Sequence, residues 1–203
     1  TYILEACREY KVDRIVFASS IYVYSDLGSF YRCSKQSCEL LIENYFKEYG
    51  LNYTILRYGS LYGRRANKFN FINNAITQAL LEGKVDRKGN GSEIRDYIHV
   101  KDVANVFLHA INNYDSMKNE IYNVGLSDIN LSKEELCEAI KKKIHDFVYL
   151  EATVGADPDQ RNYIVSNKKI ENTGFNTLYS LENGILELIK GYQMIRNNVY
   201  TNV

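Results

Sequence analysis

A tyrosine and a lysine, four residues apart, follow a short apolar segment that ends in two serines. Residues 15–24 read IVFASSIYVY, and residues 30–35 read FYRCSK. Residues four apart share one face of a helix, so Tyr31 and Lys35 are expected side by side. A phenol beside an ammonium can donate and accept a proton, although a free tyrosine titrates near pH ~10 and needs about 4 kcal/mol of anion stabilisation to act near neutrality. The pattern indicates proton transfer at a substrate oxygen, to which a serine of the strand can hydrogen-bond.

The sequence context separates this pair from two others with the same spacing, Tyr97/Lys101 and Tyr114/Lys118. Only Tyr31 follows a predicted strand that ends in Ser-Ser. Only Tyr31 opens a long segment whose apolar residues recur at helical spacing. The alternative for each pair is a surface tyrosine that packs along a lysine side chain. We therefore take Tyr31 and Lys35 as the candidate catalytic pair.

Predicted strands and helices alternate along the chain, which favours an α/β fold with parallel strands. Strands are predicted at 13–19, 52–58, 93–99, 120–125 and 146–153, and helices at 2–10, 31–49, 69–82, 103–112, 133–143 and 181–195. Asp102 is expected to cap the helix at 103–112. Ser132 and Glu135 form a capping-box motif at the start of the helix at 133–143.

Composition and charge exclude several classes of protein. The 203 residues include 25 basic and 25 acidic side chains, so the net charge is zero, which argues against a nucleic-acid or membrane-surface binder. No apolar run approaches the ~18 residues of a transmembrane helix. The four cysteines and three histidines lack the spacing of a metal site, so no metal is expected. Reduced cysteines suit a cytoplasmic protein.

Four sequence blocks, taken in order, resemble the NAD-dependent epimerase/dehydratase family of extended short-chain dehydrogenases/reductases, which acts on nucleotide sugars. They are FASSIYVY (17–24), YRCSK (31–35), LRYGSLYGRR (56–65) and GNGSEIRDYIHVKDVA (89–104). The resemblance implies a Rossmann-like, doubly wound parallel sheet with a small C-terminal substrate-binding lobe. It assigns residues 1–62, together with 101–125, to the dinucleotide-binding domain. It assigns residues 63–100 and 126–203 to the substrate-binding lobe.

A dinucleotide site also needs a glycine-rich turn between a strand and a helix, where backbone donors meet the pyrophosphate. The 203 residues contain neither G-x-G-x-x-G nor G-x-x-G-x-x-G. In the family this turn lies ahead of the helix that corresponds to residues 2–10. We therefore expect the chain to correspond to an N-terminally truncated family member, whose first strands and glycine-rich turn precede Thr1.

The resemblance also implies the roles of individual residues. Tyr31 is the expected acid/base on a sugar hydroxyl, Lys35 holds the nicotinamide ribose, and Ser20 completes the catalytic set, with Ser19 as the alternative serine. The cofactor, NAD with NADP as the alternative, is expected to contact Ser19, Tyr31, Lys35, Tyr58 and Gly59. The nucleotide-sugar substrate is expected to contact Ser20, Ser60, Arg64, Asn70, Arg95 and Arg161. Arginine suits this role because its guanidinium can bind phosphate oxygens through two parallel hydrogen bonds.

Two departures from the family pattern bear on the reaction. Ile21-Tyr22 stands where dehydratases carry an Asp-Glu pair, and neither side chain can protonate a leaving hydroxyl as a carboxylic acid would. The loop between Tyr24 and Tyr31 is shorter than is usual in the family, and Asp26 is a stand-in carboxylate within it. The sequence therefore predicts an epimerase that transiently oxidises a nucleotide sugar. The alternatives are an NAD(P)H-dependent ketoreductase, and an inactive family member that serves as a binding or dimerisation module.

Two predicted helices, at 2–10 and 35–49, carry apolar residues that are spread widely enough to cover more than one surface. These residues are Ile3, Leu4, Cys7, Leu40, Leu41, Tyr45, Phe46 and Tyr49. The resemblance implies a homodimer joined through these two helices. The alternative is that both apolar stripes face only the chain's own sheet.

Overall fold

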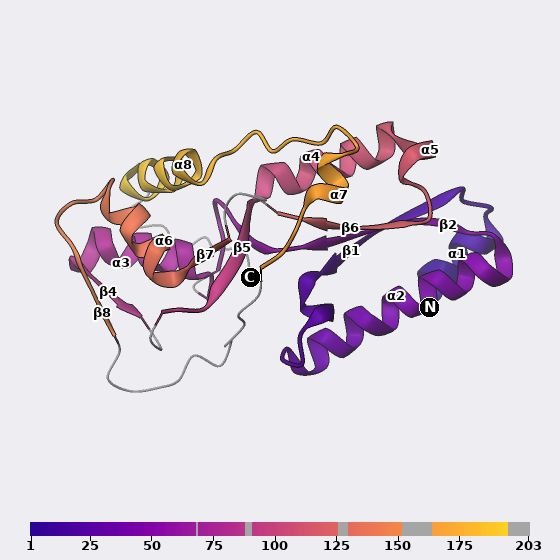
Figure 1. The fold of residues 1–203 in the computed structure, drawn as a ribbon, viewed down its shortest axis with the longest axis horizontal. Coiled ribbons are helices and arrows are strands. Elements are labelled where there is room, and N and C mark those ends of the chain that lie inside the picture. The colour runs from indigo at the N-terminus through magenta and orange to yellow at the C-terminus, as the bar shows by residue number, and fades with distance from the viewer. Residues whose placement is uncertain (68, 88–90, 126–129, 152–163, 195–203) are drawn as a thin grey trace. The chain divides into compact units, whose positions relative to one another are not determined.

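A computed structural model describes residues 1–67, 69–87, 91–125, 130–151 and 164–194. Helices and strands alternate along the chain (Figure 1), and the expected α/β fold with parallel strands is confirmed. The chain divides into two compact units. Unit 1 consists of residues 1–59, 103–125 and 165–176. Unit 2 consists of residues 60–102, 126–164 and 177–203.

Unit 1 contains a sheet of three parallel strands in the order β1-β2-β6. These are β1 (Arg14–Ser20), β2 (Asn52–Tyr58) and β6 (Glu120–Val124). One face is covered by α1 (Tyr2–Glu9) and α2 (Ser29–Tyr49), and the other by α4 (Val100–Asn112), α5 (Tyr114–Met117) and α7 (Lys168–Glu171), as Figure 1 shows. A short 3₁₀ helix, η1 (Ile21–Tyr24), joins β1 to the loop before α2.

The long helix α2 is held to the sheet by a compact apolar core. The buried members of this core are Leu4, Ile42, Tyr45, Leu51, Tyr53 and Ile55. Gly50 ends the helix with a φ of 71°, and its N–H donates to the Phe46 carbonyl at 2.9 Å. A left-handed residue at this position is a common helix terminator, and glycine adopts it without strain. The core and the terminator together fix where α2 lies on the sheet of unit 1.

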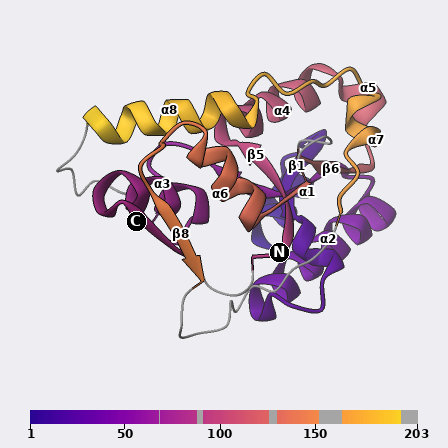
Figure 2. The same ribbon diagram turned by 60° about the vertical axis from the view of Figure 1, so that its left-hand side comes forward.

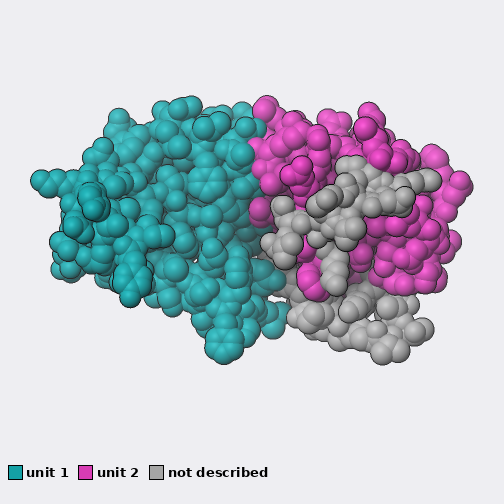
Figure 3. Space-filling model, turned by 180° about the vertical axis from the view of Figure 1, so that it is seen from behind, with its two compact units in different colours: residues 1–59, 103–125, 165–176 teal, residues 60–102, 126–164, 177–203 magenta. Residues whose placement is uncertain are grey.

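The described residues of unit 2 form two small sheets and three longer helices, and Figure 2 shows these helices from a second side. The first sheet has β3 (Ser60–Tyr62), β5 (Ile94–His99) and β7 (Asn130–Ser132), with β3 and β5 parallel and β5 and β7 antiparallel. The second pairs β4 (Lys84–Arg87) with β8 (Val148–Glu151) in parallel. The helices are α3 (Phe71–Glu82), α6 (Lys133–Lys141) and α8 (Leu181–Met194). Figure 3 colours the residues of the two units separately.

The helices of unit 2 enclose one apolar core. Its fully buried members include Tyr62, Ile72, Ile76, Leu136, Ile140 and Ile185. The capping box expected at the start of α6 is confirmed, because the Ser132 side chain accepts from the Glu135 N–H while the Glu135 carboxylate accepts from the Ser132 N–H. Within the described residues, none of the helices combines the length and the apolar character that a membrane span needs.

The expectation that Asp102 caps a helix at 103–112 is wrong. Helix α4 begins earlier, at Val100, so Asp102 lies inside its first turn. The Asp102 carboxylate instead accepts hydrogen bonds from the N–H groups of Leu178 and Tyr179, at 2.9 and 3.0 Å. Asp102 therefore holds the segment that leads into α8 through these two backbone hydrogen bonds.

Residues 165–176 differ from the expected domain ranges, since they pack with unit 1 rather than unit 2. Lys169 donates to the Ile121 carbonyl at 2.8 Å and forms an ion pair with Glu120 at 2.7 Å. Ile170 is buried. These contacts hold α7 against β6. The assignment of the two units to cofactor and substrate remains a prediction.

Candidate active site

The candidate catalytic residues of unit 1 lie around the carboxyl end of β1. Ser19 and Ser20 are the last two residues of the strand, and both are buried. Ser20 caps η1, because its hydroxyl oxygen accepts from the Tyr22 N–H at 3.3 Å. The chain then turns through Gly28 into the first turn of α2, which carries Tyr31.

Tyr31 and Lys35 share one face of α2, as their spacing predicts. The Lys35 ammonium lies 5.7 Å from the centroid of the Tyr31 ring and 5.0 Å from that of Phe17 on β1. Lys35 also donates to the Ala18 carbonyl at 2.8 Å. Tyr31 is half exposed. The structure thus brings a lysine cation and an accessible tyrosine together at the end of β1.

The two serines differ in what their hydroxyl groups contact. The Ser19 hydroxyl donates a short hydrogen bond to the buried carboxylate of Glu39 on α2. Among the residues that the structure describes, the one partner of the Ser20 hydroxyl is a backbone N–H of η1, from which it accepts a long bond. Since a hydroxyl can donate as well as accept, Ser20 keeps its own proton available for a further bond. The contacts favour Ser20 over Ser19 as the serine that meets a ligand.

The short loop before α2 is tied firmly to unit 1. The Arg32 guanidinium donates to the Ser25 carbonyl at 2.8 Å, and the Gln36 amide donates to the Val23 carbonyl at 2.9 Å. Asp26 lies 3.6 Å from Arg32, and its side chain is fully exposed. The stand-in carboxylate of the loop therefore faces water beside an arginine.

Tyr58 ends β2 next to this region, and Gly59 follows it. The Tyr58 side chain is buried against Phe107 of α4, with ring centroids 6.0 Å apart, and burial raises the pKa of its phenol. The Gly59 N–H donates to the Val124 carbonyl at 3.0 Å. The Tyr58 side chain is thus a core group, and Gly59 contributes backbone without a side chain.

In unit 2, two of the expected substrate residues line one shallow pocket of about 270 Å³. Arg64 and Asn70 belong to its wall, together with Tyr62, Arg65 and Asn67. Asn70 also caps α3 and donates to the Leu61 carbonyl at 2.7 Å. A pocket lined by two guanidinium groups and two amides suits an anionic ligand.

Two other expected substrate residues, Ser60 and Arg95, are not part of this wall. Ser60 begins β3, where it pairs with Tyr97 of β5. Arg95 is 9% exposed within β5. Arg161 lies outside the described residues. The structure therefore groups Arg64 with Asn70 but not with Ser60 or Arg95.

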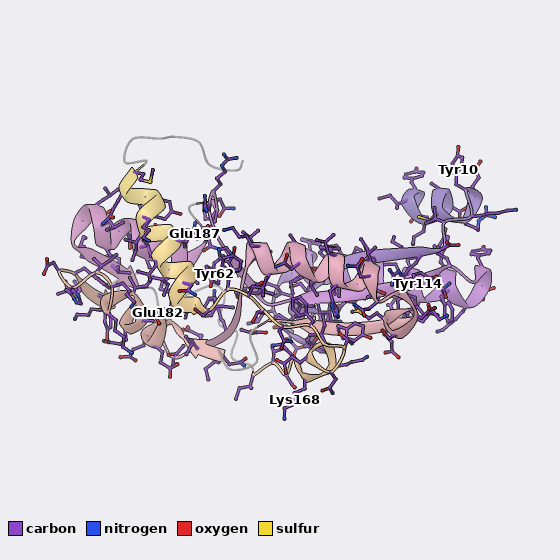
Figure 4. The ribbon with its side chains drawn as sticks, turned by 90° about the horizontal axis from the view of Figure 1, so that it is seen from above. Tyr10, Tyr62, Tyr114, Lys168, Glu182 and Glu187 are labelled. Atoms are coloured by element: carbon purple, nitrogen blue, oxygen red, sulfur yellow. The ribbon has the colours of Figure 1, made fainter. Side chains whose placement is uncertain are left out.

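The sequence does not predict a cluster of charged residues that the structure contains beside this pocket. Glu187 of α8 binds both Arg64 and Lys101, and the Lys101 ammonium lies 3.0 Å from its carboxylate. Burial alone would raise the pKa of Glu187, but the bonds from the two cations outweigh it and hold that pKa below its ordinary value. Figure 4 labels Glu187 of α8 and Tyr62 of β3, whose ring lies against Gly184 of the same helix. Arg64 and Glu187 are 123 residues apart in the sequence, so no local sequence pattern predicts this pair.

His99 lies at the centre of this cluster and is fully buried. Its ring stacks on Tyr179 at a centroid distance of 4.6 Å, and its Nδ1 accepts from the Lys101 N–H at 3.3 Å. Burial lowers the pKa of His99, and Lys101 lowers it further, although Glu187 opposes them. Among the residues that the structure describes, no group of three or more potential metal ligands occurs.

The fold and the sequence together define the class of protein. The chain belongs to the NAD dependent epimerase/dehydratase family, because the sequence model of that family matches residues 1–125. A putative UDP-glucose 4-epimerase of Methanocaldococcus jannaschii is 32% identical to this chain over 207 residues. That alignment covers 92% of this chain but only 65% of the archaeal protein, so the chain spans less than two thirds of this relative.

Solved structures agree with this assignment. One is the UDP-glucose 4-epimerase of Thermotoga maritima, solved with UDP-glucose. The match covers 96% of this chain and 68% of the Thermotoga chain, with a TM-score of 0.79 and 26% sequence identity. Another is the dTDP-glucose 4,6-dehydratase of Bacillus anthracis, solved with NAD. The match covers 98% of this chain and 67% of the Bacillus chain, with a TM-score of 0.78 and 25% sequence identity. Similar proteins therefore include both epimerases and dehydratases.

Proposed function

We propose that this protein is a nucleotide-sugar epimerase that oxidises its substrate with bound NAD and then reduces the keto-sugar from the opposite face. The observation that carries the proposal is the Lys35 ammonium beside the accessible Tyr31 at the carboxyl end of β1. Family membership supports the substrate class and the cofactor. We further propose that unit 1 is the cofactor-binding part of a doubly wound sheet, and that unit 2 binds the substrate.

The residues at the end of β1 fit the nicotinamide half of NAD. Lys35 has three N–H donors, of which the Ala18 carbonyl takes one, so its ammonium can also bind the ribose hydroxyls. Tyr31 exposes half of its surface and can reach a ligand. Gly59 puts no side chain at the end of β2. NADP is the alternative cofactor, since the residues that select between the two lie near the glycine-rich turn.

Each residue of the catalytic set has a separate task in this mechanism. Bound NAD would supply the hydride acceptor for the carbinol carbon of the sugar and the hydride donor for the return step. Tyr31 takes the proton of the sugar hydroxyl as the hydride leaves, and gives it back when the hydride returns. Lys35 stabilises negative charge on the Tyr31 oxygen, since opposite charges a few ångströms apart attract strongly in a partly buried site. Ser20 hydrogen-bonds the same sugar oxygen.

The residues that follow Ser20 support a reaction that leaves the sugar skeleton intact. Ile21 is 1% exposed and belongs to the core, and Tyr22 is a phenol. Asp26 faces water beside Arg32. Water loss from a keto-sugar needs a proton donor at the leaving hydroxyl, and none of these three side chains provides a carboxylic acid at that place. Epimerisation needs only hydride and proton transfer at one carbon.

For the substrate, we propose that Arg64 and Asn70 contact its phosphate and sugar groups within the pocket of unit 2. Ser60, Arg95 and Arg161 remain further proposed contacts. For assembly, we propose a homodimer through α1 and α2. Both helices leave large apolar side chains exposed, namely Tyr2, Ile3, Leu40, Leu41 and Tyr49.

The products formed from a panel of UDP-, dTDP- and CDP-hexoses test the proposed reaction. The protein, supplied with NAD, should give a product of unchanged mass with one inverted carbinol, identified by mass spectrometry and NMR. A product lighter by one water would refute the proposal. A product that differs by two hydrogens, formed with consumption of NADH or NADPH, would favour the ketoreductase alternative instead.

A further inference from the structure

A row of polar side chains crosses the sheet of unit 1 one residue before its catalytic end. The register aligns Ser19 of β1 with Arg57 of β2, and Arg57 with Asn123 of β6. Residues aligned in this way point to the same face of a sheet. That face is the one covered by α2, since Tyr53 and Ile55, which alternate with the same period on β2, pack in the core beneath this helix.

Glu39 of α2 meets this row from above. Its carboxylate accepts three hydrogen bonds from the Arg57 guanidinium, at 3.0 Å from Nε to Oε1, 3.2 Å from Nε to Oε2 and 2.5 Å from Nη2 to Oε2. It also accepts the hydrogen bond from Ser19. Glu39 is four residues after Lys35, so the two side chains share one face of α2. One carboxylate thus joins the helix that carries Tyr31 and Lys35 to two strands of the sheet.

The same guanidinium also holds the segment after Ser20. Arg57 donates from Nη1 to the Tyr24 hydroxyl at 2.7 Å, and that hydroxyl donates to the Asn123 amide oxygen at 3.0 Å. Tyr24 is the last residue of η1, the 3₁₀ helix that Ser20 caps. Both ends of the Ser20–Tyr24 segment are therefore fixed. The bond from Ser19 to Glu39 holds the residue before it, and the bonds of the Tyr24 hydroxyl hold its last residue.

Burial makes this ion pair different from the surface pairs of unit 1. Glu39 is 5% exposed, and the Arg57 side chain is 17% exposed. Burial by itself would lower the pKa of Arg57, but the bond to Glu39 outweighs it and raises that pKa. A buried pair is weak support for stability, since desolvation opposes the attraction between the charges. A guanidinium that binds a carboxylate through parallel hydrogen bonds, with further bonds from each partner, instead fixes the relative positions of the elements that carry them.

We propose that Glu39 and Arg57 are positioning residues for the catalytic set, an inference that rests on the proposed function. Neither side chain touches the reacting atoms. Their contacts fix α2 against the carboxyl end of β1, which keeps Lys35 on the Ala18 carbonyl and Tyr31 beside Tyr22. Small displacements of reacting groups are costly, since a shift of about 1 Å can lower a rate by about a hundredfold.

Kinetics of Glu39→Gln and Arg57→Lys test this role, with Glu120→Gln as the matched control. Glu120 forms an exposed ion pair with Lys169 in the same unit. Glu39→Gln should lower kcat by between about 10- and 100-fold with little change in KM, because substrate binding does not use Glu39. Arg57→Lys keeps the charge but loses the fork, so its defect should be smaller. The control should keep the normal kcat.

A double-mutant cycle with Tyr31→Phe separates positioning from general loss of structure. If Glu39 acts through Tyr31, Glu39→Gln should cost little further activity once the Tyr31 hydroxyl is gone. Additive effects of the two substitutions would overturn the proposal. Should Glu39→Gln fail to fold, the same cycle with Arg57→Lys decides, since that variant leaves no unpaired buried carboxylate.

Hydrogen exchange supplies a readout that does not depend on activity. Amides of residues 18–24 and 31–35 should exchange at least about tenfold faster in Glu39→Gln than in Glu120→Gln, since the local opening free energy falls when the network is broken. Faster exchange combined with a normal rate for Tyr31→Phe would show that Glu39 holds α2 against β1, but it would refute the proposed function and with it the role in catalysis. Unchanged exchange together with unchanged kcat in both Glu39→Gln and Arg57→Lys would overturn the positioning role, whatever Tyr31→Phe does.

Discussion

Tyr22 packs edge to face against Tyr31, with their ring centroids 5.6 Å apart and their planes at 80°. Gly28 lies directly against the Tyr22 ring, so that a Cβ atom at this position would come within 2.7 Å of Cδ1. The loop before α2 therefore packs closely against Tyr22, and Tyr22 in turn limits where the Tyr31 ring can lie. The short loop acts as a support for the candidate acid/base.

Replacing Gly28 by alanine should disturb this support. The backbone of Gly28 has a φ of 101°, a value that residues other than glycine rarely adopt. The new methyl group would also collide with Tyr22. We expect Gly28→Ala to lower the free energy of unfolding by about 1–3 kcal/mol and to reduce turnover. Gly50→Ala is the control, because Gly50 also has a positive φ but nothing lies within 4 Å of its Cβ position. It should cost stability without lowering turnover, as measured by urea unfolding and by rate assays.

Two glycines of α8 should respond to alanine in opposite directions. A Cβ atom on Gly184 would lie 2.4 Å from the Tyr62 hydroxyl, whereas nothing lies within 4 Å of the Cβ position of Gly191. Gly184→Ala should therefore destabilise the protein by about 1–3 kcal/mol through overpacking. Gly191→Ala should stabilise it by about 0.5–1 kcal/mol through helix propensity. Thermal unfolding followed by circular dichroism measures both, and equal signs would contradict the packing described for Tyr62.

His99 should make the stability of the protein depend on pH. Burial lowers the pKa of His99 below its ordinary value of 6.5, so below that pH the unfolded chain binds a proton that the folded chain excludes. The contribution of His99 to stability is thus fully present above pH 6.5 and is lost as the pH falls below that value toward the lower pKa of the folded state, with a slope of at most ~1.4 kcal/mol per pH unit.

Unfolding by urea at several pH values tests this dependence. His99→Asn should be less stable at pH 7.5, because it loses the ring stacked on Tyr179, but its stability should fall less between pH 7 and pH 5. His145→Asn, at an exposed position, should leave the slope unchanged. If His99→Asn kept the full slope of the parent protein, His99 would not be the group responsible.

The proposed homodimer predicts that a charge on α2 separates the protomers. Leu40 is 60% exposed on α2, and Leu108 is 59% exposed on α4, on the opposite face of the sheet. Leu40→Glu should give a monomer at tens of micromolar protein, since burying an unpaired carboxylate opposes association. Leu108→Glu should remain a dimer. Light scattering measures both, and a monomeric parent protein would refute the interface.

Local signals in the sequence were sufficient for the main elements. Strand 52–58 was predicted with its observed bounds, and the helix after Tyr31 begins only two residues earlier than expected. Alternating burial, helical spacing and terminal glycines are properties of neighbouring residues, so the sequence reveals them directly. Strands β3 and β7 have three residues each, which is too short for any period to be recognised.

The side-chain network around the site could not be predicted in the same way. The Tyr31–Lys35 pair follows from helical spacing alone. Glu39 and Arg57 meet only because the strand register and the placement of α2 bring them together across 18 residues of sequence. The available signals are an acidic residue within an apolar helix face and an arginine in an otherwise uncharged strand. Such residues indicate a buried charge but do not identify its partner.

The turnover of Tyr31→Phe tests the central claim most directly. The substitution removes one hydroxyl from a half-exposed ring, so folding should be unchanged, as circular dichroism would show. Turnover of the nucleotide-sugar substrate should fall by at least about a hundredfold, the scale expected for a positioned acid/base. Tyr114→Phe, from another pair with the same spacing, should keep a normal rate. A near-normal rate for Tyr31→Phe would contradict the mechanism proposed for this protein.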